Sequence, residues 1–152
     1  MPIAINAITP TFVAEIYDVD LARPSAEDMQ AIKQAFWKYA VLVFPDQKLT
    51  PEDHIRFSEQ FGPVEMDRVM AAENADPRLG HAFADISNLN RQGQIWEKAS
   101  RQRLYKEGNK LWHTDSSFKY RPGLCSLLYS TSVVPIGGHT EFRSEEETSE
   151  LQ

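Results

Sequence analysis

The sequence predicts an α+β fold, with helices and strands alternating in the first part of the chain and antiparallel strands in the second. Two observations lead to this prediction. Two amphipathic helical patterns, each opened by a hydroxyl residue, occur before residue 62 and alternate with short apolar runs. After residue 110, three apolar or alternating runs are separated by turns rich in glycine and proline.

The first strand and the first helix are expected near the N-terminus. Phe12–Tyr17 alternates weakly between apolar and polar residues, which is typical of a strand. Ser25 opens the helix, because Asp28 stands three residues later in a capping-box position. Apolar residues then recur at three- and four-residue steps and form one face of this helix: Met29, Ile32, Phe36 and Tyr39.

A buried strand and a second helix are expected next. Val41–Phe44 is a short apolar run closed by Pro45, which predicts a buried strand. Thr50 opens the second helix, whose first turn tolerates Pro51. This helix is expected to end at Gly62, because glycine commonly follows the last helical residue. Most of this part of the chain is therefore interpreted as scaffold.

The second part of the chain is expected to carry the functional site. Another strand is predicted at Phe83–Ile86, and a basic, polar and irregular stretch runs from Lys98 to Lys110, as active-site loops often do. The three strands predicted after it are Leu111–Phe118, Cys125–Val134 and His139–Phe142.

Composition and charge exclude several classes of protein. The 152 residues include 16 basic and 22 acidic side chains, a formal charge of −6, which argues against electrostatic binding of nucleic acid. Hydrophobic residues make up 41% of the chain, enough for a folded core. The single cysteine, Cys125, points to a reducing compartment. No apolar run approaches the roughly 20 residues of a membrane span, and no signal peptide is evident, so a cytoplasmic protein is expected.

The sequence His113-Thr114-Asp115 is the strongest candidate for chemistry. On a strand, positions i and i+2 point the same way, about 7 Å apart along the backbone. An imidazole and a carboxylate placed in this way supply two ligands of a facial triad, which binds Fe(II) with one further histidine. Taken alone, the pattern is weak, because a histidine hydrogen-bonded to a nearby carboxylate is a common structural feature.

The surrounding residues change that interpretation. Gly108–Phe118 resembles the metal-binding strand of the taurine/dichlorophenoxyacetate dioxygenase (TauD/TfdA) family. Within that family, the residues around His113 are similar to those of the dichlorophenoxyacetate branch. Thr140 follows His113 by 27 residues and lies in Gly137–Phe142, which resembles the family's second signature. Other segments similar to the family's N-terminal half are Val41–Phe44, Asp46-Gln47, Phe57–Pro63 and Ala84–Asn88.

The resemblance implies a truncated double-stranded β-helix, or jelly roll, that binds Fe(II) and takes 2-oxoglutarate as co-substrate. It further implies a dioxygenase that uses O2 to hydroxylate a small carboxylate- or sulfonate-bearing substrate, either phenoxyacetate-like or taurine-like. Succinate and CO2 are the implied co-products. No nucleic acid or membrane partner is expected.

The resemblance also implies roles for six residues. His113 and Asp115 would be metal ligands, and Thr140 would donate its hydroxyl to the distal carboxylate of 2-oxoglutarate. Asn109 matches a position that lines the co-substrate pocket. Positions near the anionic group of the substrate are matched by Ser116 and Ser117. Two alternatives stay open: Asn109 as a turn residue after a glycine, and the serines as ordinary polar residues at a strand edge.

The third metal ligand of the family, a distal histidine, and the arginine that pairs with 2-oxoglutarate lie in the second half of its domain. His139 is not expected to replace the histidine, because adjacent residues on a strand face opposite ways and Thr140 is assigned to the pocket. Residues 1–142 are therefore interpreted as the N-terminal part of such a domain, and residues 143–152 as a polar, acidic tail.

Two explanations fit an incomplete site. The chain is a fragment of a longer gene product, which we favour, or partner chains complete the site in a homo-oligomer. Two other functions stay open: a non-catalytic remnant that acts as a binding or interaction module, and a jelly roll that holds another divalent ion such as zinc.

Overall fold

The computed structural model describes residues 2–66, 79–90, 92–97, 107–133 and 135–144. The chain forms two compact units. The first unit consists of Met1–Gln60 together with Leu128–Gln152, and the second consists of Phe61–Leu127. The second unit is therefore an insertion between two segments of the first.

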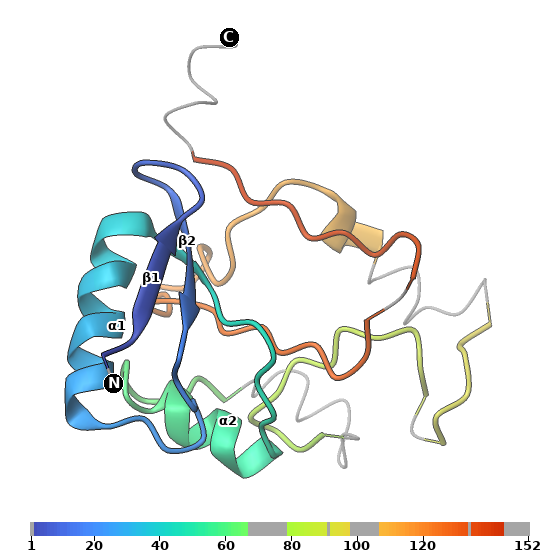
Figure 1. Ribbon diagram of the computed structural model, residues 1–152. Coiled ribbons are helices and arrows are strands. Elements are labelled where there is room, and N and C mark those ends of the chain that lie inside the picture. The colour runs from blue at the N-terminus through green and yellow to red at the C-terminus, as the bar shows by residue number, and fades with distance from the viewer. Residues whose placement is uncertain (1, 67–78, 91, 98–106, 134, 145–152) are drawn as a thin grey trace, which may run out of the picture. The chain divides into compact units, whose positions relative to one another are not determined.

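A three-stranded mixed sheet lies in the first unit (Figure 1). Its order is β1 (Ala4–Ala7), β2 (Val13–Tyr17) and β3 (Val41–Val43). The pairing of β1 with β2 is antiparallel, and that of β2 with β3 is parallel. The predicted strands at Phe12–Tyr17 and Val41–Phe44 are confirmed as β2 and β3, but β3 is not buried as expected, since Val41 and Leu42 are half-buried and Val43 is exposed. Strand β1 was not predicted.

Helix α1 (Ala26–Tyr39) begins with the capping box that the sequence predicts. The Ser25 hydroxyl accepts a hydrogen bond from the Asp28 backbone N–H at 3.1 Å, and the Asp28 carboxylate accepts one from the Ser25 backbone N–H at 2.9 Å. Hydrogen bonds that the Asp28 carboxylate accepts from Ser25, from its backbone N–H foremost and then from its side chain, hold the pKa of Asp28 below its ordinary value. The helix therefore begins where the sequence predicts.

The hydrophobic core of the first unit forms between α1 and the sheet, with α1 running alongside β1 and β2 in Figure 1. Ile16 of β2 and Ile32 of α1 are fully buried. Half-buried side chains pack around the central cluster from the flanking segments: Ile3, Val19, Leu42 and Phe44. Because the face of α1 at three- and four-residue steps supplies this core, burial of apolar surface holds the helix on the sheet.

Helix α2 (Pro51–Ser58) begins with a second capping box, formed by Thr50 and Asp53. It ends four residues before Gly62, where the sequence analysis expected its end. The Gln60 backbone N–H donates to the Phe57 carbonyl, three residues back, at 3.1 Å. Such a bond tightens the last turn and stops the helix early.

The C-terminal segment of the first unit is joined to its N-terminal segment by Tyr129. The Tyr129 hydroxyl donates to the Gln47 carbonyl at 3.3 Å and accepts from the Leu49 backbone N–H at 3.2 Å. Its ring meets the His54 ring edge to face, with centroids 5.9 Å apart. These contacts link positions about eighty residues apart in sequence, as the separations of 80 and 82 show.

The later strands that the sequence predicts are absent from the described residues. None of these predicted segments forms a strand where the structure describes it: Phe83–Ile86, Leu111–Phe118, Cys125–Val134, whose last residue lies outside the described ranges, and His139–Phe142. A strand forms only where its backbone groups pair with a neighbouring strand, and in the described part of the chain no strand pairs with these segments. Several of their apolar side chains stay exposed, with Phe118 and Val133 each at 85%. The described residues thus form a small mixed sheet and two helices rather than a full jelly roll.

Only part of the predicted active-site loop and tail can be compared with the structure. The loop prediction at Lys98–Lys110 lies outside the described residues up to position 106, and its end is the short 3-10 helix η1 (Glu107–Lys110). The acidic tail lies outside them from residue 145. Among the residues that the structure describes, no helix combines the length and the apolar character that crossing a membrane requires.

Candidate metal centre

The imidazole of His113 is held in one orientation by the backbone of the second unit. Its Nδ1 lies 2.7 Å from the Leu111 carbonyl oxygen. A carbonyl oxygen only accepts hydrogen bonds, so Nδ1 carries the proton of the neutral ring. In that neutral form Nε2 has the lone pair with which histidine binds a metal ion, whereas in the protonated ring Nε2–H pairs with Asp115.

Asp115 turns one carboxylate oxygen toward that nitrogen. The distance from His113 Nε2 to Asp115 Oδ1 is 3.3 Å. The two side chains are 47% and 61% exposed, so solvent and ions reach them. The backbone here is irregular up to residue 114 and then a turn, so the two side chains converge without the strand that was expected to align them.

The spacing of these two atoms fits a divalent cation. Nitrogen and oxygen ligands lie about 2.1 Å from such an ion, and two adjacent octahedral positions are then about 3.0 Å apart. A neutral imidazole nitrogen and a carboxylate oxygen are both acceptors, so only a cation or a proton between them makes their approach favourable. In the ranges covered by the structure, no third histidine, cysteine or carboxylate joins them in a group that could hold a metal ion.

The other oxygen of Asp115 is held by Ser126, which the sequence analysis missed. The Ser126 hydroxyl donates to Asp115 Oδ2 at 2.7 Å. Ser126 lies 11 residues from Asp115 in sequence, inside a run predicted only as a strand. No local pattern marks such a contact, because it depends on how the chain turns between the two residues.

The two serines predicted to contact substrate differ in their surroundings. Ser116, at a positive φ of 54°, donates its hydroxyl to the Glu65 carboxylate at 3.2 Å. The ammonium group of Lys119 also pairs with this carboxylate. Ser117 is exposed. Glu65 and Lys119 were not singled out from the sequence, since Glu65 is 51 residues from Ser116.

The two predicted co-substrate residues, Asn109 and Thr140, belong to different units. Asn109 lies in η1, and its side chain is outside the described part of the structure. Thr140 is exposed and belongs to the first unit, whereas His113 and Asp115 belong to the second. In the second unit, Asp115 contacts both His113 and Ser126.

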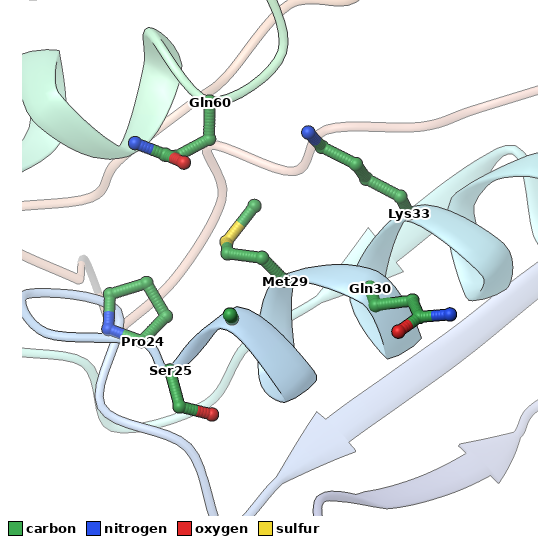
Figure 2. A pocket seen from close by; sticks show the side chains of 7 residues that line it. Pro24, Ser25, Met29, Gln30, Lys33 and Gln60 are labelled. Atoms are coloured by element: carbon green, nitrogen blue, oxygen red, sulfur yellow. The ribbon is translucent and has the colours of Figure 1, made fainter.

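An open surface groove in the first unit lies at the start of α1 (Figure 2). Figure 2 shows Met29 at its centre, with Pro24, Lys33 and Gln60 around it. None of the six predicted site residues lines this groove. We therefore place the candidate site at the His113–Asp115 pair and not at this groove.

Comparison with known proteins identifies relatives along most of the chain. It is 32% identical over 143 residues to the alpha-ketoglutarate-dependent 2,4-dichlorophenoxyacetate dioxygenase of Cupriavidus pinatubonensis, which covers 93% of this chain and 50% of that protein. It is 34% identical over 142 residues to the (S)-phenoxypropionate/alpha-ketoglutarate-dioxygenase of Sphingobium herbicidovorans, covering 91% and 44%. The chain thus spans about half the length of the curated relatives that it matches.

A solved structure supports the same relationship. The crystal structure of AAD-2 in complex with Mn(II) and N-oxalylglycine matches with a TM-score of 0.73 and 39% identity, over 80% of this chain and 43% of that one. The family model described as "Taurine catabolism dioxygenase TauD, TfdA family" matches residues 4–147. The resemblance drawn from the sequence motifs is confirmed, and this chain belongs to the TauD/TfdA family of dioxygenases.

Proposed function

We propose that this chain is the N-terminal part of an Fe(II)- and 2-oxoglutarate-dependent dioxygenase that hydroxylates a small anionic substrate of the phenoxyalkanoate or taurine type. Membership of the family supports the reaction class. The names of the relatives, which act on 2,4-dichlorophenoxyacetate and (S)-phenoxypropionate, support a phenoxyalkanoate carboxylate over a sulfonate. O2 is the oxidant, and succinate and CO2 are the co-products.

The observation that carries this proposal is the approach of His113 Nε2 and Asp115 Oδ1 to 3.3 Å. The Leu111 carbonyl orients the ring so that Nε2 faces the carboxylate. We assign both residues as metal ligands. The ion bound there would supply the redox chemistry that activates O2 at open coordination positions.

The remaining assignments extend the proposal to the organic ligands. Thr140 and Asn109 would bind 2-oxoglutarate, with the Thr140 hydroxyl donating to its distal carboxylate. Ser116 and Ser117 would contact the anionic group of the substrate. The Ser116 hydroxyl donates to Glu65, so this role requires it to exchange one carboxylate partner for another. In the whole enzyme, these residues would lie in a double-stranded β-helix to which residues 1–142 contribute the first part.

A second function is favoured by one observation. In the described part of the chain, His113 and Asp115 supply two ligands and no third, and two ligands bind an ion more weakly than three. The chain on its own is then catalytically incomplete and serves as a binding or interaction module. A third ligand supplied by a partner chain or by residues outside the described ranges would restore the dioxygenase.

An anaerobic titration of the 152-residue chain with Fe(II) and 2-oxoglutarate tests the proposal. A visible charge-transfer band is expected where 2-oxoglutarate chelates iron in an ordered pocket, and His113→Ala and Asp115→Ala should abolish it. His81→Ala, which removes an exposed histidine elsewhere in the second unit, is the matched control. A folded chain that binds Fe(II) without giving the band supports the binding module. Iron binding that survives both ligand substitutions would overturn the site assignment.

A further inference from the structure

The carboxylate of Asp115 has its two oxygens committed to different neighbours. Oδ1 faces His113 Nε2 at 3.3 Å, and Oδ2 accepts the hydroxyl of Ser126 at 2.7 Å. A hydrogen bond from a hydroxyl to an ionised carboxylate at this distance is short and about twice as strong as a neutral one. One oxygen is therefore anchored while the other is presented to the candidate metal position.

We infer that Ser126 is a positioning residue that makes Asp115 a one-oxygen ligand. The inference rests on the proposed function, in which His113 and Asp115 hold the metal ion. Without the Ser126 hydroxyl, the carboxylate can rotate about its Cβ–Cγ bond and offer either oxygen, or both. Holding Oδ2 removes this freedom before the ion arrives, which lowers the entropic cost of binding.

The backbone around Asp115 does not supply this orientation by itself. The residue stands at the start of a turn, not in a strand, and its side chain is 61% exposed. Ser126 is also exposed, while its neighbours Cys125 and Leu127 are half-buried. The Ser126 hydroxyl thus lies on the solvent side of its segment, where a lone hydrogen bond adds little to folding stability. Its main effect is on the position of the Asp115 carboxylate.

Metal binding by the full chain tests the inference without requiring turnover. Mn(II) is the probe, and the electron paramagnetic resonance signal of free Mn(II) measures its dissociation constant up to millimolar concentrations. Ser126→Ala is expected to weaken Mn(II) binding by about tenfold, the usual effect of removing a group that orients a metal ligand. Ser126→Thr keeps the hydroxyl and is expected to restore the wild-type dissociation constant.

Control variants separate this inference from the proposed function. Ser130→Ala removes another exposed serine hydroxyl, which donates to the Ser132 carbonyl, and should leave Mn(II) binding unchanged. His113→Ala should abolish binding. Far-ultraviolet circular dichroism of each variant confirms that the chain is folded.

The outcomes distinguish a failure of the positioning role of Ser126 from a failure of the metal-site assignment. If His113→Ala abolishes binding but Ser126→Ala matches the wild type, the role of Ser126 is wrong and the metal site stands. If Ser126→Thr is as weak as Ser126→Ala, the hydroxyl is not what matters and the inference fails. If the wild-type chain shows no Mn(II) binding that depends on His113, both the inference and the site assignment fail.

Discussion

Replacing Ser25 by alanine should destabilise the first unit by about 1 kcal/mol, because the substitution removes half of the capping box of α1. The lost bond is the one from the Asp28 backbone N–H to the Ser25 hydroxyl, at 3.1 Å. The reciprocal bond, at 2.9 Å, uses the backbone N–H of residue 25 and survives. Ser25 is exposed, so water partly replaces its hydroxyl, and the loss stays well below that of a buried hydrogen bond.

Urea unfolding followed by far-ultraviolet circular dichroism measures this effect, since α1 is the longest helix in the described part of the chain. A loss of about 1 kcal/mol corresponds to about a fivefold increase in the unfolded-to-folded ratio. Asp28→Ala removes the other half of the box, and the double variant should lose less than the sum of the two single losses. Thr11→Ala, at an exposed position between β1 and β2, is the matched control.

A Ser25→Ala variant whose unfolding free energy lies within about 0.5 kcal/mol of the wild type, the range of ordinary surface substitutions, would refute a stabilising role of the Ser25 cap. Strict additivity of the Ser25 and Asp28 substitutions would also contradict it, because two independent residues do not form a box.

Three further predictions follow from the fold. Ile32→Ala should cost about 3 kcal/mol of unfolding free energy, because Ile32 is fully buried and the deletion leaves a cavity; a loss below about 1 kcal/mol in urea unfolding would contradict this. Hydrogen bonds from Thr50 hold the pKa of Asp53 below its ordinary value, so its contribution to stability is present above about pH 4 and is lost as the pH falls through the folded pKa. Urea midpoints measured from neutral to acidic pH should therefore decline below about pH 4, and less steeply in Thr50→Ala. Burial raises the pKa of the Cys125 thiol, so its reaction with a disulfide reagent at mildly alkaline pH should be slower than that of a free small thiol. An equal or faster rate would count against that burial.

The elements of the first unit could be predicted from the sequence because their signals are local. A hydroxyl residue and an acidic residue three positions later mark each helix start, and the apolar steps of α1 mark its buried face. β1 could not be found in this way. All of its residues, Ala4–Ala7, are exposed, so it carries no alternation of buried and exposed side chains and is held by its backbone bonds to β2.

The candidate site was predictable only in its sequence-adjacent part. His113 and Asp115 are two residues apart and stand inside a family motif, so a pattern could find them. Ser126 and Glu65 reach the site region through turns of the chain, and no periodicity encodes such turns. The strands expected after residue 110 could not be predicted reliably for a similar reason. An alternating pattern determines which side chains share a face of a strand, but it does not provide the neighbouring strand that pairs with it.

The contact of Tyr129 with the N-terminal segment bears on the order in which the chain folds. Closing a loop of about eighty residues costs on the order of 4 kcal/mol of chain entropy, and the two hydrogen bonds of Tyr129 return about 2 kcal/mol. Its ring contact with His54 adds about 1 kcal/mol. Tyr129 therefore docks late, after the inserted unit has become compact and shortened the effective loop. During synthesis, the sheet and both helices can form before Tyr129 leaves the ribosome, and refolding should show a fast helical phase followed by a slower docking phase.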